Sequence, residues 1–353
     1  MRAFRIGVIG RTAYGTNLCD GQTVKTQVVV EELKIKYPNA KIDIADTYLL
    51  IRKKRLRLLL DIIRCLIRDD VLFVLLSSNG RRVIFPIISL LNAVLKKPII
   101  HDCIGGKIGK DAQNNPRLAK EMNGFTVNYV ESKSLVKELQ EAGVTNAEYL
   151  PNFKRLSVLD ESQIKVDQQT IRVCTFSRVC KAKGIADAVK AVREINRDRQ
   201  NNKIYLDIYG PVEKEYEEEF HALLESAHGE AVYKGVANPA DSVRILREYY
   251  LLLFPTVFEG EGFPGTLIDA FSSGLPVIAT DWHLNSEIIE HGRTGFLYSW
   301  KEPEKLEQWM RYAMEHPEEV QKMRSNCIEE VKKYDPDRVM DIIAKKIDAV
   351  LKK

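Results

Sequence analysis

The chain has 353 residues, of which 45% are apolar and 29% are charged, and its formal net charge is +4. This is the composition of a soluble globular protein, and the length exceeds what one hydrophobic core usually serves, so two domains are expected. The six cysteines are scattered and form no CxxC pair, which argues against a disulfide framework or a zinc site and for a reducing compartment.

No targeting segment is expected at the N-terminus. The residues MRAFRIGVIG lead directly into a strand pattern, without the features of a signal peptide. No charge-free run reaches the roughly 18 residues that a membrane-spanning helix needs. A cytoplasmic location is therefore expected.

Short β-branched runs alternate with helical patterns along the chain, which is typical of parallel sheets built from βαβ units. Strands are predicted in the first half at Phe4–Ile9, Lys41–Ile44, Val71–Leu75, Pro98–His101, Thr126–Val130 and Ala147–Tyr149. In the second half they are predicted at Ile171–Phe176, Ile204–Tyr209, Ala231–Lys234, Leu251–Phe254 and Pro276–Ala279. Predicted helices include Val24–Lys36, Gly184–Asn196 and Glu215–Ala227.

A domain boundary is predicted near residues 155–170, where one strand pattern ends and a polar segment follows. The predicted ranges are 1–160 for the N-terminal domain, 161–330 for the C-terminal domain and 331–353 for a C-terminal helix. The predicted fold class is α/β, with two doubly wound parallel-sheet domains facing each other across a cleft. In such sheets, ligands bind outside the carboxyl ends of the strands.

The first loop, residues 10–21, ends at Gly21 where a helix pattern begins. A glycine at a helix start lets a diphosphate approach the backbone. The loop lacks the GxGxxG spacing, so an ordinary turn between strand and helix is an equal interpretation.

The segment Leu49–Arg68 carries an apolar face and a separate stripe formed by Arg57, Asp61, Arg64 and Arg68. Residues 1–160 hold 26 Lys and Arg against 16 Asp and Glu, a net charge of +10, whereas residues 161–353 hold 27 against 33. Two interpretations remain open, a surface helix packed on the N-terminal sheet and peripheral attachment to an anionic membrane.

Two further patterns follow predicted strands. His101 ends one strand, where its imidazole could donate a hydrogen bond to a sugar hydroxyl or a phosphate, although a structural role is as good an interpretation. Arg178 and Lys183 follow the strand Ile171–Phe176, and Gly184 then opens a helix. This spacing places two cations around one phosphate-sized volume, unless the turn is only a solvated basic one.

The stretch Phe254–Phe296 is the most informative part of the chain. Glu261 stands beside a Gly-Phe-Pro-Gly loop, and Asp269 follows with seven residues between them. A loop at a helix start exposes backbone N–H groups to an anion, here those of Phe263, Gly265 and Thr266. Two acids flanking such a loop accept hydrogen bonds from hydroxyls, so a nucleotide-sugar is the first candidate ligand.

Together these residues resemble family 4 of the retaining glycosyltransferases with the GT-B fold, which consists of two Rossmann-like domains. The resemblance implies that Arg178 and Lys183 hold the donor diphosphate and that Glu261 contacts the donor sugar. It implies donor-site roles for His101 and for the loop from Gly262 to Thr266, and a ribose contact for Asp269, where the family has glutamate. It also implies that residues 331–353 cross back to the N-terminal domain.

The implied activity is retaining, metal-independent transfer of a sugar from a nucleoside-diphosphate sugar, with a UDP-sugar favoured, to a glycan or lipid-linked acceptor. Pieces such as Pro151–Lys154 and Asp207–Pro211 resemble a bacterial branch that assembles surface polysaccharides, which implies work at the inner face of the cell membrane. No cofactor, metal or nucleic-acid partner is expected. The alternatives are a nucleotide-sugar epimerase of the same fold and a non-catalytic nucleotide-sugar-binding subunit.

Overall fold

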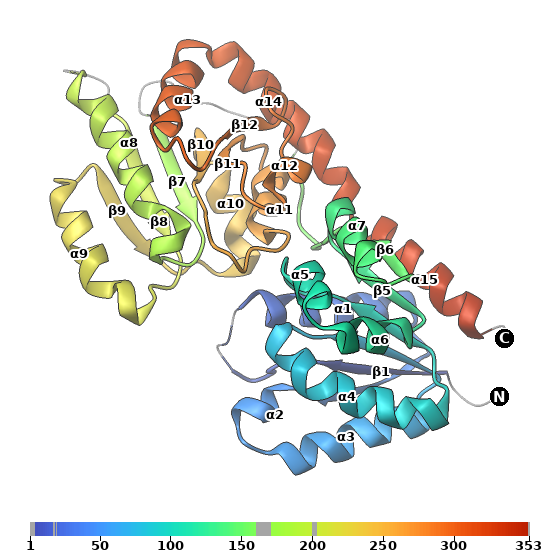
Figure 1. Cartoon of the computed structure of the whole chain (residues 1–353). Coiled ribbons are helices and arrows are strands. Elements are labelled where there is room, and N and C mark those ends of the chain that lie inside the picture. Colours follow the sequence, from blue (N-terminus) through green and yellow to red (C-terminus); the bar gives the residue numbers. More distant parts are fainter. Residues whose placement is uncertain (1–3, 17, 19, 160–170, 200–202, 352–353) are drawn as a thin grey trace. The chain divides into compact units, whose positions relative to one another are not determined.

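The computed structural model describes residues 4–16, 18, 20–159, 171–199 and 203–351 (Figure 1). The chain divides into two units, the first formed by residues 1–155 and 335–353 and the second by residues 156–334. The predicted domain ranges stay a prediction, because the predicted boundary between residues 160 and 161 lies outside the described residues. Within the described part of the chain, no helix combines the length and apolar character needed to cross a bilayer.

The first unit is built on a parallel six-stranded sheet with the strand order β2-β1-β3-β4-β5-β6. Its strands are β1 (Arg5–Gly10), β2 (Lys41–Asp46), β3 (Val71–Leu75), β4 (Ile99–Asp102), β5 (Val127–Val130) and β6 (Ala147–Tyr149). Its helices are α1 (Gly21–Lys36), α2 (Tyr48–Ile51), α3 (Arg55–Arg68), α4 (Ser78–Leu95), α5 (Ile108–Gln113), α6 (Pro116–Asn123), α7 (Lys133–Glu141) and α15 (Pro336–Leu351).

The second unit repeats this plan with a six-stranded parallel sheet in the order β12-β11-β10-β7-β8-β9. Its strands are β7 (Arg172–Phe176), β8 (Tyr205–Tyr209), β9 (Ala231–Gly235), β10 (Leu251–Phe254), β11 (Val277–Thr280) and β12 (Gly295–Tyr298). Its α-helices are α8 (Ile185–Arg197), α9 (Glu217–Ser226), α10 (Ser242–Leu246), α11 (Gly265–Ser272), α12 (Asn285–Ile288), α13 (Glu304–Glu315) and α14 (Pro317–Val331). Single 3₁₀ turns are η2 (Lys181–Lys183), η3 (Lys214–Tyr216), η4 (Pro239–Asp241) and η5 (Lys332–Tyr334).

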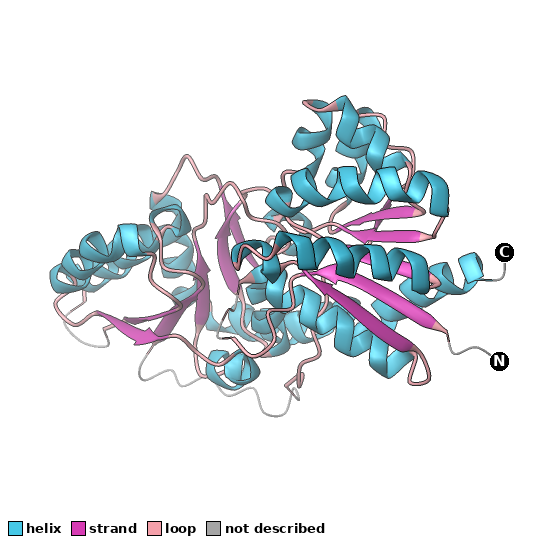
Figure 2. Ribbon diagram, turned by 90° about the horizontal axis from the view of Figure 1, so that it is seen from below, coloured by secondary structure: helices cyan, strands magenta, loops and turns pink. Residues whose placement is uncertain are grey.

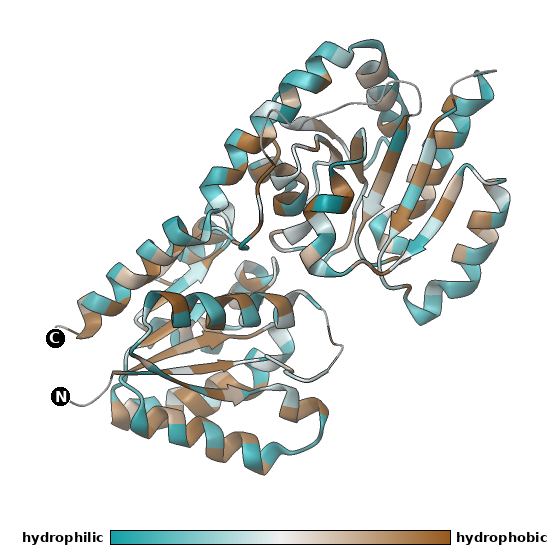
Figure 3. Cartoon of the chain, turned by 180° about the vertical axis from the view of Figure 1, so that it is seen from behind, coloured by the Kyte–Doolittle hydropathy of each residue, from teal (hydrophilic) through white to brown (hydrophobic). Residues whose placement is uncertain are grey.

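Helices cover both faces of each sheet, as Figure 2 shows. Central strands such as β3 and β10 are therefore buried along their whole length and consist of continuous apolar residues rather than alternating ones. Figure 3 shows the same contrast, with hydrophobic strands inside and hydrophilic residues along the outer helices. The predicted fold class, two doubly wound parallel-sheet Rossmann-like domains, is confirmed.

Three local predictions differ from the structure. The segment Leu49–Arg68 forms two helices, because Lys53 adopts a left-handed φ of 55° between them. Helix α1 begins at Gly21 rather than Val24, because the Asp20 carboxylate accepts hydrogen bonds from the amides of the first turn. Strand β12 has no counterpart among the predicted strands.

Candidate active site

The loops after β7 and β10 meet at one edge of the second sheet. These two strands are hydrogen-bonded neighbours, so the segments that follow their carboxyl ends emerge side by side. The amide of Val257 donates to the carbonyl of Ala182 at 2.8 Å. Gly184, at a φ of 68°, allows this approach, since a Cβ there would lie 2.2 Å from the carbonyl oxygen of Pro255. The sequence spacing thus places Lys183 directly against the β10 loop.

Lys183 and Glu261 form an ion pair that is almost enclosed by protein. Their side chains are 8% and 12% exposed, respectively. The Lys183 ammonium also lies 5.3 Å from the ring centroids of both Phe254 and Phe258. The structure therefore brings together two residues that are 78 positions apart in the sequence.

Thr256 fixes the carboxylate of Glu261 from the other side. Its buried hydroxyl donates to Glu261 Oε2 at 3.0 Å and accepts from the amide of Phe258 at 3.2 Å. Its carbonyl accepts from the hydroxyl of Thr280 on β11 at 2.5 Å. Both Lys183 and Thr256 bind Oε2, so the orientation of the whole carboxylate is set by two neighbours.

Arg178 lies on the same aromatic ring as Lys183. Its guanidinium carbon is 5.3 Å from the centroid of Phe258, and its Nη1 donates to Glu213 Oε1 at 2.7 Å. The Arg178 side chain is 45% exposed, so the cation faces solvent. Two positive charges thus share one ring, which cation–π attraction favours.

Helix α11 begins beside this pair of cations. The hydroxyl of Thr266 donates to the carbonyl of Phe176 at 2.8 Å, which ties the start of α11 to the end of β7. Pro264 occupies the N-cap position, and no side chain caps the helix. A Cβ at Gly265 would meet nothing within 4 Å, so the approach to the first turn is open there.

The remaining residues of this predicted loop differ in exposure. Gly262 is partly exposed, whereas Phe263 is buried and packs its ring against Tyr334 at 5.1 Å between centroids. Asp269 is buried on α11, one turn beyond Gly265. Phe263 therefore contributes a core side chain, and its predicted ligand contact is confined to the backbone.

His101 does not lie at a ligand-accessible surface. Its side chain is fully buried in β4, enclosed by the rings of Phe85 and Phe125, and its Nδ1 lies 2.9 Å from Asn128 Oδ1. Burial and the nearby Arg81 lower the pKa of His101 to about 3, so the imidazole is neutral. The expectation that it donates to a sugar or phosphate is not met, because protein covers it on all sides.

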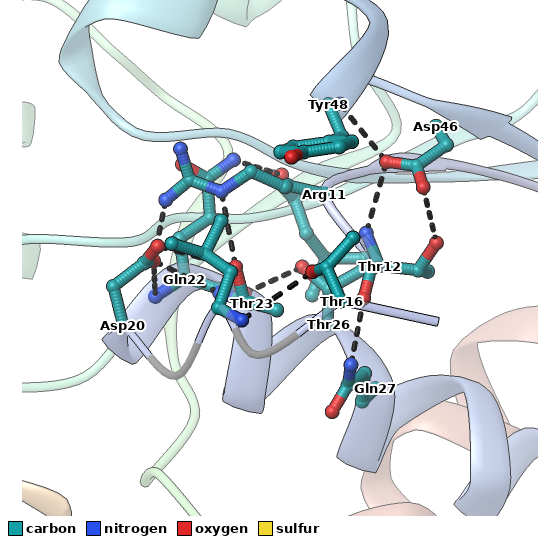
Figure 4. Close-up of polar contacts among 12 residues, drawn as sticks. Arg11, Thr12, Thr16, Asp20, Gln22, Thr23, Thr26, Gln27, Asp46 and Tyr48 are labelled. Carbon is teal, nitrogen blue, oxygen red and sulfur yellow. Dashed lines mark hydrogen bonds and ion pairs between the residues drawn. The ribbon is translucent and has the colours of Figure 1, made fainter. Parts of the chain in front are cut away.

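Gly21 begins α1, but the helix start is already occupied (Figure 4). Asp20 Oδ1 accepts from the amides of Gln22 and Thr23 at 3.1 Å each, and Arg11 forms an ion pair with Asp20. The amides that a diphosphate would use are bonded to the protein's own carboxylate. This conformation disfavours an anion at Gly21.

Sequence reasoning missed Phe258, the ring shared by both cations. Its position is fixed by the indole of Trp282, whose Nε1 donates to the Phe258 carbonyl at 3.0 Å. A Cβ at Gly260 would lie 2.7 Å from the same ring, so glycine makes room for it. The sequence carries an aromatic residue beside a Glu-Gly pair, but nothing in it shows which residue the ring faces.

Comparison with known proteins assigns this site to a class. Residues 159–334 match the family model of the glycosyl transferases group 1, which covers the second unit and includes Arg178, Lys183 and Glu261. D-rhamnosyltransferase WbpZ of Pseudomonas aeruginosa is 29% identical over 120 residues, which are 33% of this chain and 30% of that protein. The GtfA subunit of a peptide N-acetylglucosaminyltransferase of Streptococcus pneumoniae is 32% identical over 142 residues, 40% of this chain and 26% of that protein. The matched stretches thus span less than a third of these relatives.

Solved structures agree on the fold along the whole chain. Anabaena HepE in complex with UDP-glucose has a TM-score of 0.73 at 15% identity and covers 98% of this chain and 99% of that one. Sucrose-phosphate synthase from Thermosynechococcus elongatus has a TM-score of 0.75 at 13% identity, with the same coverage. At these identities the likeness shows the fold, which is GT-B. Fold and family model together support membership in the group 1 glycosyltransferases.

Proposed function

We propose that this protein transfers a sugar from a nucleoside-diphosphate sugar, with UDP favoured, to a hydroxyl of a glycan or lipid-linked glycan. Within the proposal the anomeric carbon keeps its configuration and no metal ion takes part. The acceptor belongs to a surface polysaccharide and is met at the inner face of the cell membrane. The main support is the cluster of Arg178, Lys183 and Glu261 around the Phe258 ring, beside the uncapped start of α11.

In this proposal the two cations, Arg178 and Lys183, bind the donor diphosphate. The ion pair of Arg178 with Glu213 is exposed, and such pairs contribute only about 0–1 kcal/mol. A diphosphate that accepts two hydrogen bonds from the guanidinium competes with it readily. Lys183 has three donor hydrogens, so its ammonium keeps Glu261 while also binding a phosphate oxygen.

In this proposal Glu261 binds the donor sugar. Lys183 and Thr256 both bind its Oε2, which orients Oε1 as an acceptor for a sugar hydroxyl. Asp269, which lies one helical turn beyond Gly265, binds the ribose of the nucleotide. The loop that begins at Gly262 lies at the phosphates in this proposal, and Phe263, Gly265 and Thr266 supply the backbone N–H groups. His101 and Gly21 have no part in it, since one is buried and the other lies at a helix start capped by Asp20.

The reaction places its developing charge on the leaving diphosphate. As the glycosidic bond breaks, Arg178, Lys183 and the α11 amides stabilise that charge, as preorganised donors do in an oxyanion hole. A phosphate oxygen on the same face takes the proton of the attacking hydroxyl. The new bond then forms on the face that the leaving group vacates, which retains the configuration.

An assay of UDP release tests this function. Purified protein is incubated with a panel of nucleotide-sugars, with and without a membrane lipid extract that contains acceptors. A transferase releases UDP faster with the extract, an epimerase forms a new nucleotide-sugar without it, and a binding subunit does neither.

Arg178→Ala is expected to lower turnover about 100-fold or more, because one charge-stabilising donor is lost. Lys181→Ala is the matched control, since Lys181 lies three residues after Arg178, in the 3₁₀ turn that ends at Lys183, but is 81% exposed and pairs with Glu219. Near-normal turnover of Arg178→Ala, or an equal loss in Lys181→Ala, would contradict the assignment of Arg178.

A further inference from the structure

Helix α3 has two apolar sides, and one of them faces solvent. Leu58, Ile62, Cys65 and Leu66 are buried on the side that packs on the first unit. On another side Leu56, Leu60, Ile63 and Ile67 recur at intervals of four, three and four residues, which forms one stripe along a helix. Leu56, Leu60 and Ile67 are 58–72% exposed. Burial on the sheet therefore accounts for four of the nine apolar residues of α3.

Helix α4 carries a second stripe with the same spacing, formed by Val83, Ile87, Leu90 and Val94. Val83, Leu90 and Val94 are 48–83% exposed. Helices α3 and α4 are in contact, and each connects parallel strands, so they run parallel to each other (Figure 1). The two stripes make up one surface of eight residues, here called the α3–α4 apolar surface.

Basic side chains surround this surface. Arg57, Arg64 and Arg68 form the neighbouring stripe on α3, and the turn before α3 is Arg52-Lys53-Lys54. Arg82 precedes Val83 on α4, and Lys96 follows the end of that helix. One carboxylate, that of Asp61, lies within the α3 stripe, 4.0 Å from Arg57.

The apolar stripes and their basic neighbours together indicate which kind of partner binds the α3–α4 apolar surface. Single exposed apolar side chains are common, but a contiguous set on two adjacent helices marks an interaction surface. A second copy of the chain would bring like charges together, which opposes association through this face. An anionic bilayer takes both features, because leucine, isoleucine and valine enter the acyl boundary while arginine and lysine reach the headgroups.

We propose that the α3–α4 apolar surface lies on an anionic lipid bilayer with its apolar side chains inserted below the headgroups. The choice of lipid as partner rests on the proposed function, in which the acceptor is met at a membrane. The inference goes beyond attachment by a basic stripe, because apolar insertion adds a contribution that salt does not screen. Helix α4, whose residues gave no membrane signal in the sequence, supplies half of the surface.

Cosedimentation with vesicles tests this surface. The full chain is mixed with vesicles of phosphatidylcholine alone or with phosphatidylglycerol added, at low and high salt. It should bind the anionic vesicles, and high salt should weaken the binding without abolishing it. The double variant Leu60→Glu/Leu90→Glu should bind at least about tenfold more weakly, since each change replaces an inserted side chain by a charge.

Two further variants make the result specific. Ile35→Glu is the matched control, because Ile35 is 59% exposed on α1, which packs with α15 away from α3 and α4, and its vesicle binding should be unchanged. Arg64→Glu/Arg82→Glu keeps the apolar residues and should lose the preference for anionic vesicles. The thermal unfolding transition of the first unit, followed without lipid, should be the same in all variants and shows that α3 and α4 are folded, whereas UDP binding reports on the second unit.

The inference is overturned if the chain does not bind anionic vesicles at low salt, or if Ile35→Glu weakens binding as much as Leu60→Glu/Leu90→Glu. It is also overturned if sedimentation velocity without lipid shows a dimer that the double variant dissociates, since the surface would then bind a second copy. Loss of UDP release in solution with vesicle binding intact would instead refute the proposed function alone.

Discussion

Phe258 presents one ring to two cations, and its effect on ligand binding is testable at the scale of a single residue. Phe258→Leu keeps apolar volume but removes the π-face beneath Arg178 and Lys183. Each cation–π contact contributes about 0.5–2 kcal/mol, so loss of one such contribution should lower UDP affinity about 2- to 30-fold as the cations lose their fixed positions. Isothermal titration calorimetry with UDP measures this. Phe258→Tyr should bind as the parent does, and an unchanged affinity in Phe258→Leu would refute the role of the ring.

Because His101 is buried, the free energy of unfolding should depend on pH. Its pKa lies at about 3 in the folded chain and near 6.5 when unfolded, because burial and Arg81 oppose the charged form. The unfolded chain therefore binds a proton between about pH 6.5 and 3 that the folded chain does not, so the free energy of unfolding falls as the pH is lowered through this window. Between pH 7 and pH 5 the loss from this residue should be about 2 kcal/mol.

Urea denaturation of the parent and of His101→Asn at pH 7 and pH 5 checks this. The variant is less stable at both values because a buried imidazole is replaced, but its stability should change less between them, by about 2 kcal/mol. The comparison also separates the effect of His101 from that of Asp69. Burial and the neighbouring Asp43 raise the pKa of Asp69 to about 6, so Asp69 increases the free energy of unfolding as the pH falls, opposite to His101. Equal pH dependence in the two proteins would show that His101 is charged or exposed.

At the scale of elements, α1 is bound to the first sheet by a buried charge. Lys25 on α1 donates to Asp102 Oδ1 at 2.8 Å and to Glu131 Oε1 at 2.7 Å, at the ends of β4 and β5. All three side chains are buried. Lys25→Met should lower the free energy of unfolding by about 3–5 kcal/mol, because two buried carboxylates lose their cation.

Chemical denaturation of Lys25→Met measures this, and Lys34→Met is the control. Lys34 lies on the same helix, is half exposed and pairs with Glu31, so its replacement should cost less than about 1 kcal/mol. The two losses would be similar only if Lys25 were solvated. Parent-like stability of Lys25→Met would therefore contradict a buried triad.

Elements and strand ends were predictable from the sequence where one local signal decides the outcome. Continuous apolar runs between polar turns identified β3 and β10, because both faces of these sheets are covered. Strand β12 has four residues and begins at a glycine, which is too short a pattern to stand out. The helix break at Lys53 depends on one left-handed residue, which no apolar periodicity reveals.

The candidate site was likewise predictable where a local sequence pattern marks it. Lys183 and Glu261 follow different strand ends, and their spacing to Gly184 and the Gly-rich loop suggested one binding region, which the ion pair between them fits. Which side chains face solvent and which are buried was not predictable from the sequence. The strand was predicted to end at His101 and ends at Asp102, one residue later. Because the sheet is covered on both faces, every residue of β4 is buried, so position along the strand does not decide exposure.

At the scale of the whole molecule, the chain passes between the units twice, after residues 155 and 334. Helix α15 then completes the core of the first unit with Val339, Met340, Ile343 and Ile347, which pack with Val29, Val30 and Leu33 of α1. The second unit, with its candidate donor site, lies wholly between the two passages. Changes to α15 should therefore affect the two units differently.

Removal of residues 335–353 tests this division. Full burial of an apolar side chain contributes about 1.5–3 kcal/mol, so four of them are worth about 6–12 kcal/mol, which is comparable with the entire stability of a typical domain. The first unit of the shortened chain should be largely unfolded at 25 °C, while the second unit keeps its own core. UDP should still raise the unfolding temperature of the second unit. A ligand at about 100 times its Kd adds about 2.7 kcal/mol to the free energy of unfolding of the domain that binds it. Native-like amide-exchange protection in β1 and β3 would show that α15 is dispensable, and loss of the UDP-dependent shift would show that the first unit is needed to hold the nucleotide.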